Sequence, residues 1–124
     1  MLQKLLLIGC GGFLGCILRY TVSHFFVKFG GGFPYGTLIV NTAGCLVIGF
    51  VMGLNISKGI LTENTLLFFV TGLLGGFTTF SAFSYETLCF LKADAYFMAA
   101  LNVTLNIILG LVGAFGGFFI AKLF

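Results

Sequence analysis

The chain has 124 residues, of which 60% are hydrophobic and 7% are charged, and its formal net charge is +3. Six basic and three acidic side chains cannot cover the surface of a soluble domain of this size, so the composition excludes a small soluble protein. It favours an all-α protein that crosses a membrane several times, and we expect no nucleic-acid partner.

The first apolar segment, from about residue 5 to residue 26, is long enough to span a bilayer. Its apolar run exceeds the core of a signal peptide and has no small-residue cleavage site before Arg19, so we interpret it as a span. Gly11 and Gly15 lie four residues apart, which is typical of helix faces that pack closely. Arg19 lies some 22 Å along this helix if the helix begins near Lys4. It either faces an anion in a water-filled vestibule or snorkels to the interface.

A connection at 30–34, Gly-Gly-Gly-Phe-Pro, separates this segment from a second span, expected from about residue 35 to residue 54. Asn41 sits early in the second span, with Thr37 one turn before it. Its amide offers two donors and one acceptor. A helix–helix hydrogen bond and a role in an ion path are equally open for it.

The third span, from about residue 65 to residue 91, contains the run Gly-Gly-Phe-Thr-Thr-Phe-Ser-Ala-Phe-Ser at 75–84. Two glycines and several hydroxyls predict that this helix is broken in the middle of the membrane, with unwound backbone over 75–79. Such a break favours an ion site, because free carbonyls suit a cation such as Na⁺.

Phe77, Phe80 and Phe83 are spaced to form one stripe if the segment is helical. The stripe is either core packing or a pore lining, in which the positive ring edges attract a small anion beside the hydroxyls of Ser81 and Ser84. Glu86 follows within two turns, either as a proton or cation site or as a carboxylate that reaches a wet cavity.

The fourth span is expected from about residue 95 to residue 122, which leaves one four-span domain over 1–124. Its small and amide residues share one helical face: Asn102, Asn106, Gly110, Gly113 and Gly117. We expect the glycines to serve helix packing. None of the four cysteines forms a metal-type pair, so we expect them to be small buried apolar residues.

Lysines are balanced between the two sides of the membrane. With four spans, both termini and the 55–64 loop share one side, which holds Lys4, Lys58 and Lys122, whereas Lys28 and Lys92 lie on the other. Because a strong excess of positive charge fixes orientation, its absence predicts insertion both ways round and an antiparallel homodimer.

Three stretches, Gly11–Tyr20, Pro34–Asn41 and Gly72–Glu86, together resemble the Fluc (CrcB) family of fluoride channels, in order along the whole chain. The resemblance implies a dual-topology homodimer in the cell membrane. Such a dimer lets fluoride leave the cell passively down its gradient, which gives fluoride resistance, and has two pores and a central structural Na⁺.

The resemblance also implies roles for individual residues. Phe80 and Phe83 would line the pore, with Asn41 as the pore amide, and the carbonyls of Gly75 and Thr78 from both subunits would hold Na⁺. Four further residues are candidates for the polar path or vestibule, with Arg19 in the vestibule: Ser81, Ser84, Thr37 and Glu86. Where some family members carry hydroxyls along the last span, this chain has Gly110 and Ala114, with Asn106 one turn earlier.

Two other functions compete with a fluoride channel. A small proton-coupled multidrug exporter is also an antiparallel four-helix dimer, but it needs a membrane carboxylate, and the first span has Arg19 and no acid. An assembly subunit of a larger membrane complex would not transport ions by itself. An enzyme is not expected, because the chain lacks a nucleophile–base set and a metal-ligand cluster.

Overall fold

The computed structural model describes residues 1–28 and 31–124, and over these residues every regular element is a helix. The elements are α1 (Leu2–Val27), α2 (Tyr35–Lys58), α3 (Glu63–Leu66), the π-helix η1 (Leu67–Leu74), α4 (Gly75–Phe77), α5 (Phe80–Lys92) and α6 (Tyr96–Ala121). Within the described residues, four segments are long and apolar enough to cross a membrane: 2–27, 35–58, 63–92 and 96–121. The expected all-α class and four spans are therefore confirmed.

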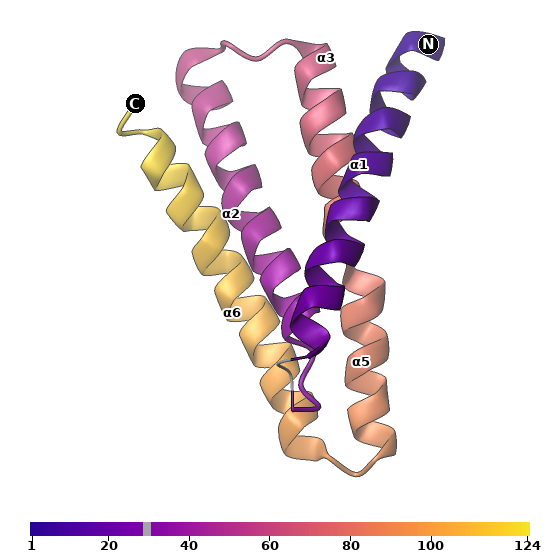
Figure 1. Cartoon of the computed structure of the whole chain (residues 1–124). Coiled ribbons are helices and arrows are strands. Elements are labelled where there is room, and N and C mark those ends of the chain that lie inside the picture. Colours follow the sequence, from indigo (N-terminus) through magenta and orange to yellow (C-terminus); the bar gives the residue numbers. More distant parts are fainter. Residues whose placement is uncertain (29–30) are drawn as a thin grey trace.

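The four spans form two pairs (Figure 1). Helices α2 and α6 pack side by side along their length, while α1 packs against the third span at η1 and α4. Both termini and the turn between α2 and α3 lie at the same end of the molecule, and the turn between α5 and α6 lies at the other. At the terminal end, Lys4 pairs with Glu63, and Lys58 donates to the carbonyl of Phe124. The expected placement of these lysines at one end is confirmed.

Glycines let both helix pairs approach closely. A Cβ added at Gly15 in α1 would lie 2.1 Å from the Leu73 carbonyl oxygen, and one at Gly117 in α6 would lie 2.0 Å from the Leu46 carbonyl oxygen. Neither position has room for any side chain, because each backbone is in contact with a neighbouring helix. The interpretation of these glycines as packing residues is confirmed.

The third span is the irregular one. After the short α3 it continues as the π-helix η1, and the amide of Gly75 donates to the carbonyls of Val70 and Gly72. Gly75–Phe77 is helical, and the backbone leaves the helix only at Thr78 (φ −79°, ψ 158°) and Thr79 (φ −152°, ψ 115°). We refer to these two residues as the interruption.

The expectation of unwound backbone over 75–79 was therefore wrong for its first three residues, which keep helical dihedrals. The single phenylalanine stripe was also wrong, since Phe77 ends α4 whereas Phe80 begins α5, on the other side of the interruption.

Two smaller expectations concern the first connection and the cysteines. Gly30, the first residue of the connection expected at 30–34, lies outside the described residues, while Gly31 and Gly32 adopt positive φ values of 49° and 96° that favour glycine. Burial of the cysteines was wrong for Cys10, Cys16 and Cys89, which are exposed on the single chain, and Cys45 is half-buried. Thiol groups are apolar enough to face lipid or a neighbouring subunit.

Candidate functional site

The site is built around the interruption. Thr79 is the N-cap of α5, and its hydroxyl accepts a hydrogen bond from the amide of Ala82 at 3.2 Å. This cap satisfies one of the free amides at the start of α5. Thr79 was missed as a site residue from the sequence, although a threonine three residues before Ala82 is a recognisable cap signal.

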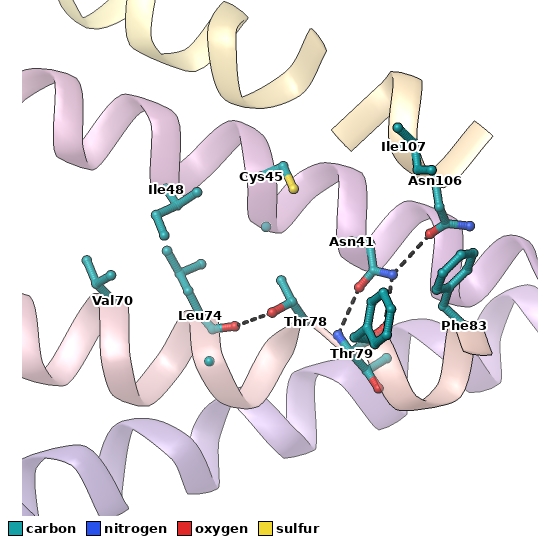
Figure 2. A pocket seen from close by; sticks show the side chains of 13 residues that line it. Asn41, Cys45, Ile48, Val70, Leu74, Thr78, Thr79, Phe83, Asn106 and Ile107 are labelled. Carbon is teal, nitrogen blue, oxygen red and sulfur yellow. Dashed lines mark hydrogen bonds between the residues drawn. The ribbon is translucent and has the colours of Figure 1, made fainter. Parts of the chain in front are cut away.

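Asn41 of α2 binds the backbone of the interruption through its side-chain amide (Figure 2). Its Oδ1 accepts from the Thr79 amide at 2.8 Å, and its Nδ2 donates to the Thr79 carbonyl at 3.1 Å. In an uninterrupted helix the Thr79 amide would donate to the carbonyl of Gly75. The side chain of Asn41 therefore takes the place of a helical hydrogen bond and releases the Gly75 carbonyl from its helical donor.

The second N–H of Asn41 reaches α6. Nδ2 donates to Oδ1 of Asn106 at 3.0 Å, and Asn106 in turn donates to the carbonyl and Oδ1 of Asn102, each at 3.0 Å. Asn102 is fully buried and donates to the hydroxyl of Thr87 at 3.0 Å. Of the two roles considered for Asn41, the helix–helix hydrogen bond is therefore present. Both N–H groups of its amide already donate, one to the Thr79 carbonyl and one to Asn106.

A pocket of about 390 Å³ opens beside these groups, and none of its lining residues is charged. Its polar lining comes from Asn41, Asn106, Thr78 and Thr79, and Phe83 lies beside them (Figure 2). Phe80 completes the aromatic lining. The two rings are tilted by 57° with centroids 5.5 Å apart.

Phe80 and the neighbouring hydroxyls face outward. Phe80 is 78% exposed on the single chain. Ser81 and Ser84 are also exposed: the Ser84 hydroxyl donates to the Phe80 carbonyl at 2.9 Å, and the Ser81 hydroxyl lies 3.3 Å from that of Thr79. The structure thus brings the expected aromatic and hydroxyl residues together at the start of α5.

Arg19 points at the interruption rather than along α1. Its Nη1 donates to the Thr78 carbonyl at 3.3 Å, and its Nη2 lies 3.7 Å from Sγ of Cys16. The guanidinium is half-buried. A positive charge therefore lies beside one of the two carbonyls expected to hold Na⁺.

A second polar contact lies one turn from Asn41 toward the start of α2. The buried hydroxyl of Thr37 donates to Oε1 of Glu86 at 2.5 Å. The other carboxylate oxygen, Oε2, is buried and has no hydrogen-bond partner among the residues that the structure describes. Both residues line a small pocket of about 120 Å³. Glu86 and Thr37 thus form a separate polar site outside the larger pocket.

The last span, α6, carries its asparagines near its start and packs against α2 further along. Gly110 and Ala114 face α2: the nearest atom to a Cβ on Gly110 is Sγ of Cys45, and the Ala114 carbonyl oxygen lies 2.0 Å from a Cβ built on Gly49. In this chain that part of α6 packs against α2, and the polar groups of α6 lie further toward its start, at Asn102 and Asn106.

These features define a small multi-pass membrane protein with an uncharged, partly aromatic pocket at a helix interruption. A family model described as CrcB-like protein, Camphor Resistance (CrcB), matches residues 6–118. The chain belongs to this family, which confirms the resemblance drawn from its motifs.

Similar proteins match most of the chain's length. A protein of Clostridium novyi (strain NT) named "Fluoride-specific ion channel FluC" is 45% identical, and the match covers 98% of each chain. Proteins with the same name are 49% identical in Clostridium perfringens, over 86% of each chain, and 45% identical in Dehalococcoides mccartyi, over 97% of this chain and 93% of the relative.

Proposed function

We propose that this protein is a fluoride channel of the cell membrane, which lets fluoride leave the cell passively and thereby gives fluoride resistance. The observation that carries the proposal is the pocket at the interruption, where amide, hydroxyl and ring groups converge and no lining residue is charged. The family and the names of its members support the same function.

The chemistry of the pocket suits a small, strongly hydrated anion. Conduction requires that the pore replace water with groups that bind well enough to admit the ion and weakly enough to release it. A lysine in the pocket would hold fluoride, whereas the edges of Phe80 and Phe83 carry only partial positive charge. A fluoride ion takes an N–H of Asn41 only by displacing the Thr79 carbonyl or Asn106 Oδ1. The donors are therefore weak and replaceable.

A second copy of the chain completes the pore. Phe80 and the hydroxyls of Ser81 and Ser84 are exposed on the single chain, in a segment that belongs to a candidate membrane span. Polar groups inside a bilayer face protein or a water-filled path, not lipid. This favours a homodimer that covers these groups, and the balance of lysines between the two ends favours an antiparallel one with two pores.

We also propose that the interruption contributes to a central Na⁺ site. Because the Thr79 amide donates to Asn41, it no longer donates to the Gly75 carbonyl as it would in a helix. The backbone of Thr78 is extended, so its carbonyl is not aligned with the helix axis. Backbone carbonyls released from a helix are groups that hold Na⁺ in membrane proteins, and here Na⁺ would take the place of Arg19 Nη1 at the Thr78 carbonyl. One chain supplies two such oxygens, so a shared site between two copies would offer four. When bound, the ion would supply positive charge at the interruption.

Purified protein in liposomes tests the channel directly with a fluoride-selective electrode. We expect wild-type protein to release trapped fluoride without a proton gradient while trapped chloride stays inside. Phe80→Ile, which keeps an apolar side chain but removes the ring edge, should slow the release sharply. Absence of fluoride release from well-folded wild-type protein would overturn the proposal. Proton-driven uptake of a cationic dye would instead identify the exporter.

A further inference from the structure

We propose that Thr87, Asn102 and Asn106 are positioning residues that fix the turn of α5 carrying Phe80 and Phe83. They do so through a continuous chain of side-chain hydrogen bonds that we call the amide chain: Asn41, Asn106, Asn102 and Thr87. The inference rests on the proposed function and deepens it, because it assigns the groups that hold the pocket's aromatic residues in place; of these groups, Thr87 and Asn102 lie outside the pocket lining.

The amide chain begins and ends on the same short stretch of backbone. It starts where the Thr79 amide donates to Asn41, crosses from α2 to α6, and returns to α5 where Asn102 donates to Thr87. The Thr87 hydroxyl then donates to the Phe83 carbonyl at 2.8 Å. The two backbone anchors, Thr79 and Phe83, enclose the first turn of α5.

Each bond in the amide chain runs in the same direction. Asn41 donates to Asn106, Asn106 to Asn102, and Asn102 to Thr87. Reversing one amide would place two carbonyl oxygens or two N–H groups face to face at its contacts. Since Asn102 is fully buried, no water is available to relieve such a mismatch. The amides are therefore set together, and the Thr87 hydroxyl supports, through Asn102 and Asn106, the orientation of Asn41 that its bonds to Thr79 require.

This arrangement explains why polar residues occur in the apolar interior between α2, α5 and α6. Close packing of the helices does not require these polar residues, because glycines such as Gly117 provide it. Asn102 and Thr87 do not line the pocket, yet among the described residues they complete the path of side-chain hydrogen bonds from Asn41 through α6 to α5. Their effect on fluoride would be exerted through Asn41 and the Phe83 carbonyl.

Thr87 offers a matched pair of substitutions. Thr87→Val keeps the shape of the side chain and removes the hydroxyl, while Thr87→Ser keeps the hydroxyl. Asparagine side chains labelled with ¹⁵N report the amide chain by NMR in detergent micelles, with the Asn41 signal assigned by its loss in Asn41→Asp. Thr104→Val is the control, because it makes the same chemical change at an exposed site on α6.

We expect Thr87→Val to shift the side-chain signals of Asn41 and Asn102 and to slow fluoride release from liposomes by at least about tenfold, because the hydroxyl both accepts from Asn102 and donates to the Phe83 carbonyl. Thr87→Ser should restore both, and Thr104→Val should leave the Asn41 signal and the release unchanged. If Thr87→Val does not assemble, Thr87→Ala carries the same expectation.

An unchanged Asn41 signal in folded Thr87→Val would overturn the amide chain, and a shifted signal with wild-type release would overturn its positioning role. Failure of the proposed function is recognised separately, since wild-type protein would then release no fluoride while the NMR result would still stand on its own.

Discussion

Replacing Asn41 by aspartate tests how the interruption and the anion path depend on one side chain. Asn41→Asp exchanges the Nδ2 group for an oxygen and leaves the shape almost unchanged. The acceptor for the Thr79 amide is retained, while the two donated bonds, to the Thr79 carbonyl and to Oδ1 of Asn106, are lost. Each of these oxygens would then face another oxygen.

Two terms set the size of the effect. Leaving a buried polar group without its partner costs about 1–3 kcal/mol, so the loss of two donors is expected to lower the stability of the fold measurably. A carboxylate about 5 Å from a passing anion adds a barrier of about 3 kcal/mol at an effective dielectric constant of about 20. Because each 1.36 kcal/mol changes a rate tenfold, fluoride release should fall by at least about 100-fold.

The assay is fluoride release from liposomes, with the amount of folded protein checked by size-exclusion chromatography. Asn64→Asp is the matched control, since it adds the same charge at an exposed residue near the start of the third span and should release fluoride at the wild-type rate. Release by folded Asn41→Asp within about tenfold of wild type would refute the electrostatic reasoning, because the expected barrier would then be absent.

Three further predictions follow from the contacts. Gly117→Ala places a methyl group 2.0 Å from the Leu46 carbonyl oxygen and should lower stability by about 1–3 kcal/mol in thermal unfolding. Gly116→Ala is the control, because no atom of the described residues lies within 4 Å of its added methyl group. Equal melting temperatures of the two variants would contradict the close packing of α2 and α6. Thr37→Val removes the donor to Oε1 of Glu86 and should lower stability by about 1–3 kcal/mol in thermal unfolding, while Thr37→Ser should not; equal melting temperatures of Thr37→Val and wild type would show that the hydroxyl is dispensable. Reconstitution in N-methyl-glucamine salts without Na⁺ should weaken dimer association and slow release, and unchanged association and release would remove the case for sodium at the interruption.

Most of the fold could be predicted because it depends on segment length and apolar composition. The four spans end within four residues of their expected limits, since charged and glycine-rich turns mark their boundaries. The shared face of Asn102 and Gly117 followed from helical spacing alone, which is a local property of the chain.

The position of the interruption could not be predicted from local preference. Gly75 and Gly76 are the weakest helix formers in the run, yet they remain helical, and the break falls at two threonines. The break falls there because Asn41, far away in the sequence, bonds both the amide and the carbonyl of Thr79. A tertiary contact thus outweighs propensity.

Arg19 shows the same limit. Its depth along α1 could be estimated from the rise of a helix, and the choice between a vestibule and the interface was left open. The contact with the Thr78 carbonyl depends on how α1 packs against the third span, which single-sequence reasoning does not provide. Thr87 was missed for a similar reason, because its partner Asn102 lies on the next span.

The location of both chain ends at the same end of the molecule constrains gene fusion (Figure 1). Joining the last residue of one repeat to the first residue of another by a short polar linker would give both repeats the same orientation. A tandem protein whose halves point in opposite directions would require an additional membrane crossing, or another odd number of crossings, between its repeats.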